Sequence, residues 1–154
     1  MKHWLMKSEP ESYSIDDFAR DKRTLWTGVR NYQARNFMMN DMKPGDLFFF
    51  YHSNAEPTAI VGIGEILKSN QADPTALDKK SDYYDPKASK DHPIWFCAEV
   101  GFKKKLEAIS LADLKTHKEL KDMALLQKGS RLSVQPVSKS EFDFISKLAG
   151  KSKK

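Results

Sequence analysis

The sequence predicts an α+β fold in which a curved mixed sheet or small open β-barrel carries short helices on its outside. Apolar runs at residues 47–51, 59–67 and 94–102 are typical of buried strands, while Ser14 and Ser138 stand where helix N-caps are expected. These elements follow one another irregularly rather than as a repeated alternation of strand and helix. Such an order favours a mixed sheet flanked by helices over a doubly wound parallel sheet.

The amino-terminal part is expected to contain one strand and two helices. Residues 3–6 read as a short strand. Ser14 then caps a helix whose first turn carries Asp16 and Asp17, where carboxylates interact favourably with the helix dipole. Asn31 caps the next helix, which runs toward residue 39.

The middle of the chain predicts a pair of strands. The sequence Lys43-Pro-Gly-Asp46 is typical of a turn, and the aromatic run 47–51 that follows is expected to be buried on both faces. In the next strand, 59–67, Gly62 and Gly64 indicate a bulge or a close backbone contact.

A long polar excursion and the carboxyl-terminal elements complete the fold. Residues 71–90 form the excursion, which carries the exposed pair Tyr83 and Tyr84; loops of such length are usually functional or mobile. The strand 94–102 follows, and Ser110 begins a short helix. Residues 131–135 alternate like a strand with Arg131, Ser133 and Gln135 on one face, and Ser138 with Glu141 forms a capping box for a helix ending at Gly150.

Length and charge indicate one domain with a local anion site. The 154 residues fit a single domain at 1–150 followed by a basic tail at 151–154. The net charge is +5, and the segment 22–40 holds four bases and no acid, although a solvated face has the same composition. The single Cys97 excludes an internal disulfide and agrees with a reducing compartment. We expect a cytoplasmic location, or the nucleoid if the protein binds DNA, and no membrane span.

The segment 26–36, Trp-Thr-Gly-Val-Arg-Asn-Tyr-Gln-Ala-Arg-Asn, has the side chains needed to hold a nucleobase. Trp26 has a flat face for stacking, and Arg30 and Arg35 are cations for phosphate. Asn31 or Gln33 could read a base edge through paired donors and acceptors, and Gly28 leaves room for a close backbone approach. A nucleic-acid partner is therefore expected.

Catalysis has weaker support in the sequence. His52 and Ser53 are adjacent on a predicted strand, so their side chains point to opposite faces and cannot act as nucleophile and base. The four histidines lack metal-ligand spacing, and one cysteine cannot build a structural zinc site. We expect no catalytic residues, no cofactor and no metal.

Five motifs in order along the chain resemble the EVE domain family. They are Trp4-Leu-Met-Lys-Ser-Glu-Pro10, Tyr13-Ser-Ile-Asp-Asp17, the segment 26–36, Phe50-Tyr-His-Ser-Asn54 and Arg131-Leu-Ser-Val-Gln-Pro-Val137. The resemblance implies a PUA-like fold, an open β-barrel with flanking helices, and kinship to the YTH domains, which capture N6-methyladenine in an aromatic cage. It also implies binding of modified bases, notably modified cytosines in DNA, without established catalytic chemistry.

The resemblance guides a site hypothesis. Lys7-Ser8 and Trp26-Thr27 stand where related YTH motifs place base-reading and cage residues, but Glu9 replaces the YTH residue, so adenine specificity does not carry over. A carboxylate suits the exocyclic amine of cytosine. The predicted base pocket comprises Ser8, Glu9, Trp26, Thr27, Asn31, Tyr51, His52 and Ser53, and the predicted phosphate-binding rim comprises Lys7, Arg30, Arg35, Arg131 and Ser133.

Two alternative functions stay open, and so does the identity of the residue that forms the second wall of the pocket. An enzyme, such as a PUA-like nuclease or base-processing activity, would use Lys7, Glu9 or His52 as acid–base groups. A small-molecule sensor would take a free nucleoside in the same pocket. Tyr51, Tyr83 and Trp95 compete as the second aromatic wall.

Overall fold

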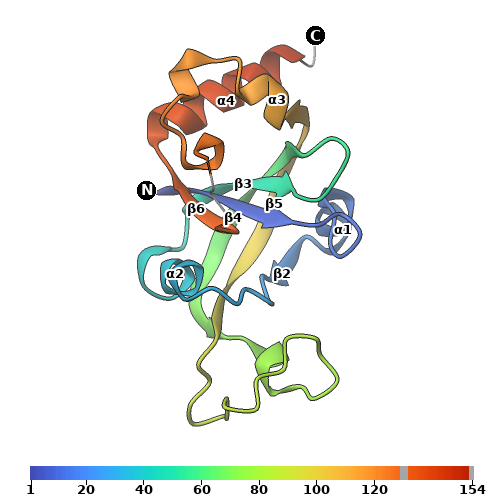
Figure 1. Cartoon of the computed structure of the whole chain (residues 1–154), viewed down its shortest axis with the longest axis vertical. Coiled ribbons are helices and arrows are strands. Elements are labelled where there is room, and N and C mark those ends of the chain that lie inside the picture. Colours follow the sequence, from blue (N-terminus) through green and yellow to red (C-terminus); the bar gives the residue numbers. More distant parts are fainter. Residues whose placement is uncertain (129–131, 153–154) are drawn as a thin grey trace.

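Six strands form one mixed sheet in the computed structural model, which describes residues 1–128 and 132–152 (Figure 1). The strand order is β2-β5-β4-β3-β1-β6, with β1 and β3 parallel and the other pairs antiparallel. The strands are β1 (His3–Ser8), β2 (Arg23–Leu25), β3 (Leu47–His52), β4 (Ala59–Ala72), β5 (Phe96–Ser110) and β6 (Val134–Val137).

The predicted α+β class with a mixed sheet is confirmed, whereas closure into a barrel is not observed. Within the described ranges, β2 pairs with β5 alone and β6 pairs with β1 alone, so both remain edge strands. The sheet is therefore open.

Both faces of the central strands are buried because each face contacts its own core. Phe48 and Phe50 point into a cluster with Trp4 and Phe18, and the intervening Phe49 points into a second cluster on the opposite face. All three phenylalanines of β3 are fully buried, as the aromatic run predicted. The first cluster lies beneath α1 and α2, and the second beneath α3 and α4.

The four α-helices begin where the sequence predicted. They are α1 (Ile15–Asp21), α2 (Tyr32–Asn36), α3 (Leu111–Leu114) and α4 (Lys139–Ser152). Ser14, Asn31 and Ser110 each accept a hydrogen bond from a backbone N–H of the first turn, and Ser138 forms a capping box with Glu141. None of the helices in the described ranges is long and apolar enough to cross a bilayer.

Some element boundaries differ from the prediction. The helix after Asn31 becomes a π-helical turn at Phe37–Asp41, and α4 ends at Ser152 rather than at Gly150. Strand β6 begins at Val134, and Gln135, which was predicted on a polar face, is only 1% exposed. Its side-chain amide donates to the Leu132 carbonyl, and this bond allows a polar side chain to lie in the core.

Strands β4 and β5 are longer than predicted and position the excursion. They pair with register shifts next to Gly62 and Gly64, which confirms the irregularity that these glycines indicated. The segment 73–95 connects the two strands and lies at the opposite end of the long axis from α3 and α4 (Figure 1). It contains the 3-10 helix Pro74–Leu77; further 3-10 turns lie at Lys118–Leu120 and Ala124–Leu126. Tyr83 and Tyr84 are exposed, as expected.

Candidate functional site

A cavity of about 660 Å³ opens where the end of β1, the segment after β2 and the excursion 73–95 meet. Its volume is within the usual range for small-molecule sites. It is lined by residues 7–9, 12–13 and 24–30 together with Ser53, Tyr83 and Ser133. Segments that are distant in sequence therefore share one cavity.

Eight of the thirteen site residues predicted from the sequence line this cavity. They are Lys7, Ser8, Glu9, Trp26, Thr27, Arg30, Ser53 and Ser133. Four others do not line it, namely Asn31, Arg35, Tyr51 and His52. Arg131 lies outside the described residues.

Three of the residues predicted for the base pocket have structural contacts instead. The Asn31 side chain accepts from the backbone N–H of Ala34 at 3.0 Å and so caps α2. Tyr51 is 3% exposed and belongs to the core beneath α3 and α4. The His52 Nε2 atom accepts from the backbone N–H of Ile15 at 3.1 Å, and burial lowers the pKa of this imidazole. These contacts give the three side chains structural roles outside the cavity lining.

Trp26 belongs to both the core and the cavity wall. Its indole is 7% exposed and packs edge-to-face against Phe48 and Phe50, at centroid distances of 5.7 and 5.3 Å. The backbone N–H of Trp26 donates to the Ala98 carbonyl at 2.8 Å, which ties this residue to β5. The indole is therefore a rigid part of the wall.

Lys7 is the cavity's half-buried cation. It lies in β1, and its Nζ is 6.0 Å from the centroid of the Tyr51 ring. Among the described residues no carboxylate forms an ion pair with it. Burial lowers the pKa of Lys7, because desolvation disfavours its charged form. An anionic or carbonyl group of a ligand would stabilise this ammonium.

A tight turn after β1 presents Ser8 and Glu9. The Ser8 hydroxyl donates to the Tyr13 carbonyl at 2.7 Å, and the Glu9 carbonyl accepts from the backbone N–H groups of Ser12 and Tyr13. One Glu9 carboxylate oxygen accepts from the Asn54 amide at 2.7 Å. The other oxygen makes no hydrogen bond within the described part of the chain and is available to a ligand.

Tyr13 is fixed at the edge of the cavity. Its hydroxyl donates to Asp21 at 3.0 Å. Burial and this acidic partner raise the pKa of Tyr13 to about 12, so the phenol stays protonated at neutral pH.

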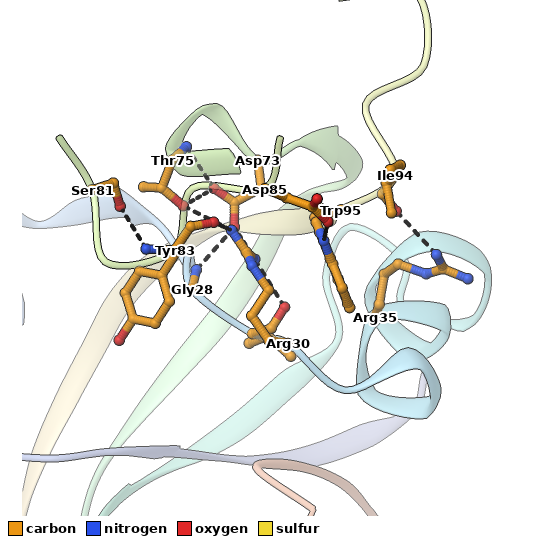
Figure 2. A network of polar contacts seen from close by, with 11 residues as sticks. Gly28, Arg30, Arg35, Asp73, Thr75, Ser81, Tyr83, Asp85, Ile94 and Trp95 are labelled. Atoms are coloured by element: carbon orange, nitrogen blue, oxygen red, sulfur yellow. Dashed lines mark hydrogen bonds and ion pairs between the residues drawn. The ribbon is translucent and has the colours of Figure 1, made fainter. Parts of the chain in front are cut away.

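Arg30 is held by the excursion rather than directed to solvent. Its guanidinium forms an ion pair with Asp73 (Nη1–Oδ2 3.0 Å) and lies between the rings of Tyr83 and Trp95, 5.4 and 5.0 Å from their centroids (Figure 2). It also donates to the Tyr83 carbonyl and to the Thr75 hydroxyl. The guanidinium that was expected to bind phosphate therefore already has several intramolecular partners.

Asp73 is the acidic centre of this network. Its side chain is 1% exposed and accepts from the backbone N–H of Gly28, from Arg30 and twice from Thr75. Burial alone would raise the pKa of Asp73, but these hydrogen bonds outweigh it and hold the pKa below its ordinary value. The carboxylate therefore fastens the segment 26–30 to the excursion.

Arg35 is occupied in the same way, farther from the cavity. It donates to the Ile94 carbonyl at 3.0 Å (Figure 2). It also donates to the Asn36 side chain, and its guanidinium is 4.8 Å from the centroid of the Tyr32 ring. Tyr32 in turn stacks on Trp95 at a 4.9 Å centroid distance. Arg35 thus fastens the far end of the excursion.

The predicted pocket and rim did not include Asp73, and Tyr83 was only one of three candidates for the second wall. The exposure of Tyr83 in a long polar excursion was a usable signal, but the sequence did not indicate that the excursion folds back onto Gly28. Asp73 had a local signal as a helix N-cap, since it precedes Pro74 and its carboxylate accepts from the Thr75 backbone N–H at 2.8 Å. Its contacts with Gly28 and Arg30, more than forty positions away, had no local signal. Within the described ranges, no three His, Cys, Asp or Glu residues are grouped to hold a metal ion.

Known proteins resemble this chain over nearly its whole length. The family model described as "EVE domain" matches residues 2–148. Human thymocyte nuclear protein 1 is 42% identical over 169 residues, which cover 97% of this chain and 74% of the relative. A hypothetical protein from Leishmania major has a TM-score of 0.95 at 42% identity, covering 100% of this chain and 98% of that one.

Human thymocyte nuclear protein 1 (THYN1) has also been solved with a ligand. The crystal structure of human THYN1 in complex with DNA containing 5-methylcytosine has a TM-score of 0.89 at 41% identity, covering 97% of this chain and 98% of that one. The match to the family model extends over nearly all of the described residues. The chain belongs to the EVE domain family.

Proposed function

We propose that this protein is a non-catalytic reader of a modified base in nucleic acid, most simply a modified cytosine in DNA. The observation that carries the proposal is the cavity of about 660 Å³, which combines an indole, a carboxylate and a cation without an acidic partner among the described residues. The likeness to human THYN1, whose structure contains 5-methylcytosine DNA, supports the choice of base. The binding unit is the single domain 1–150.

The residues of the cavity suit a cytosine-type base. The carboxylate oxygen of Glu9 that Asn54 does not use can accept from the exocyclic amine of cytosine. Trp26 supplies aromatic surface, and Lys7 can neutralise a phosphate or donate to a base carbonyl. Ser8, Thr27 and Ser53 add polar groups to the same wall.

The energies of the two opposing steps are of similar size. Extruding a base from a duplex costs a few kcal/mol. Stacking on aromatic side chains returns about 1 to 3 kcal/mol per base. Contacts with the phosphate backbone of the nucleic acid must therefore contribute. Lys7 can supply one, because it lines the cavity and has no intramolecular ion pair in the described chain.

Two other functions have less support. An enzyme would use Lys7, Glu9 or His52 as an acid–base group. Lys7 and Glu9 line the cavity, whereas His52 does not, and its Nε2 accepts from the Ile15 backbone N–H. A nucleoside sensor would use the same cavity without contacts to a polymer.

Binding to matched oligonucleotides tests the proposal. Affinities would be measured for a DNA duplex with one 5-methylcytosine, the same duplex with cytosine, the equivalent RNA and the free nucleoside. We expect tightest binding to a modified polymer and no altered product after long incubation. Equal affinity for all polymers would contradict base reading. Product formation would favour the enzyme, and tight nucleoside binding without preference for polymer would favour the sensor.

A matched pair of glutamates tests the role of Glu9. Glu9→Ala should weaken binding to the modified duplex, because it removes the acceptor for the base amine. Glu11→Ala is the control, since Glu11 is exposed on the same turn but does not line the cavity. Equal effects of the two substitutions would mean that only the general negative charge matters.

A further inference from the structure

We propose that Tyr83 is the second wall of the base pocket and that the Arg30–Asp73 pair, by holding Tyr83 in place, determines which bases fit. The inference rests on the proposed function and deepens it. Tyr83 thereby becomes a specificity-determining residue, and Arg30 and Asp73 become positioning residues rather than ligand contacts.

Of the three aromatic residues that the sequence offered as the second wall, only Tyr83 lines the cavity within the described chain. Tyr13 also lines it, but its ring packs against Phe18 and Phe50 and its hydroxyl donates to Asp21. Tyr51 is 3% exposed in the core on the other face of the sheet. Trp95 is 7% exposed and stacks on Tyr32, with its indole N–H donated to Asp85. Tyr83 is 45% exposed and therefore has ring surface that a base can contact.

The position of the Tyr83 ring is set by direct contact with the segment that carries Trp26. A Cβ atom at Gly28 would lie only 2.7 Å from Cε2 of Tyr83, so the ring packs against the bare backbone at this position. Gly28 has a φ of +85°, a conformation that favours glycine. The close approach predicted at Gly28 exists, and Tyr83 is the group that makes it.

The Arg30 guanidinium joins both walls. One Nη atom donates to the Asp73 carboxylate, which also accepts from the backbone N–H of Gly28 at 2.9 Å. The other Nη atom donates to the Tyr83 carbonyl at 2.8 Å (Figure 2). A planar fork is needed to reach the two sites at once, and lysine has none.

The same contacts argue against a phosphate role for Arg30. The guanidinium forms an ion pair with the buried Asp73 carboxylate. It also lies between the aromatic rings of Tyr83 and Trp95. A phosphate contact at Arg30 would have to compete with these partners. A positioning role predicts instead that Arg30 affects base preference and leaves the salt dependence of binding unchanged.

The first test compares two neighbouring tyrosines on the full chain. Tyr83→Ala should lower affinity for the 5-methylcytosine duplex roughly 5- to 150-fold, the range for losing one stacked aromatic, whereas Tyr83→Phe should retain most of it. Tyr84→Ala is the control, because Tyr84 is exposed but does not line the cavity. If the wild type prefers the modified duplex and Tyr83→Ala binds it equally well, this inference is overturned while the proposed function stands. A wild type without that preference overturns the proposed function.

The second test separates positioning from phosphate contact at Arg30. Arg30→Lys and Asp73→Asn should both reduce the ratio of affinities for modified and unmodified duplexes, and the slope of log affinity against log salt should equal that of the wild type. Full binding by Arg30→Lys, together with a slope lower by about 0.9 in Arg30→Ala, would assign Arg30 to a phosphate and overturn its positioning role. Circular dichroism of each variant checks that it is folded. If an Arg30 or Asp73 variant unfolds, the Tyr83 variants still test whether Tyr83 is the second wall of the pocket.

Discussion

The Nε2 atom of His52 accepts a hydrogen bond from the backbone N–H of Ile15, 3.1 Å away, at the first residue of α1. His52 ends β3, so one imidazole joins the central strand to the helix that covers the first core. Only a neutral imidazole can accept at Nε2. Burial is the main cause that lowers the pKa of His52. Two nearby charges also act on this pKa: Asp16 raises it and Lys105 lowers it.

This relationship predicts a loss of stability on acidification. Because the folded pKa of His52 lies below its unfolded value of 6.5, the unfolded state binds the proton more readily. The stabilisation is complete above pH 6.5 and declines as the pH falls toward the folded pKa. Denaturant unfolding at several pH values would measure it.

The contribution of His52 can be isolated from that of His3, whose pKa is also lowered, chiefly by burial. His52→Gln keeps a side-chain acceptor that does not titrate in this range. We expect its free energy of unfolding to fall less between pH 7 and pH 5 than that of the wild type. Parallel pH profiles for the two proteins would contradict the role assigned to His52.

Lys7 should control the salt dependence of DNA binding. Lys7 lines the cavity and has no acidic partner in the described chain. Lys7→Ala removes this cation, so the slope of log affinity against log salt should fall by about 0.9 if one phosphate contact is lost. Titrations at several salt concentrations measure the slope. Lys7→Arg should restore it.

Lys104 provides the matched control for this prediction. It is exposed on β5 and does not line the cavity. Lys104→Ala should leave the slope unchanged. If Lys7→Ala weakens binding equally at every salt concentration, Lys7 contacts the base rather than the phosphate.

The local elements could be predicted from sequence because their causes are local. The caps at Ser14, Asn31 and Ser138 depend on a side chain and an N–H two or three residues away. The burial of both faces of β3 followed from an unbroken apolar run. The predicted polar face of residues 131–135 was wrong at Gln135, whose polarity conceals a core position.

Motifs in separate segments of the sequence pointed to residues that lie together in the structure. Ser8, Glu9, Trp26 and Thr27 all line the cavity. Arg30 could not be distinguished from a free cation, since its acceptors lie at Asp73 and Tyr83, more than forty residues away. The folding-back of the excursion thus determines which of the cationic side chains remain available.

Asp46 should be important for stability, although it lies away from the cavity. Its carboxylate is 4% exposed and accepts from the Trp4 indole at 3.1 Å and from the backbone N–H groups of Lys2 and Lys43. Asp46→Ala leaves these donors without their acceptor and should reduce the free energy of unfolding by about 3 kcal/mol. Asp82→Ala, at an exposed position, should change it by less than about 0.5 kcal/mol. Thermal or denaturant unfolding would compare the two, and similar values would contradict the role of Asp46.

Gly64 is required for the central aromatic packing. A Cβ atom here would overlap the buried ring of Phe48 and lie 3.0 Å from the Gly101 carbonyl, and neither neighbour is flexible. Gly64→Ala should therefore lower the free energy of unfolding by about 1 to 3 kcal/mol. Gly101→Ala meets mainly the Leu67 side chain, which can rotate, so its effect should be smaller.

A double-mutant cycle links the effect of Gly64→Ala to Phe48. If the overlap with the ring is the cause, Gly64→Ala should destabilise a Phe48→Leu protein less than it destabilises the wild type, because the leucine leaves room for the new methyl group. Denaturant unfolding of the four proteins gives the coupling energy. A coupling energy of zero would mean that the Gly101 carbonyl, rather than Phe48, excludes a side chain at Gly64.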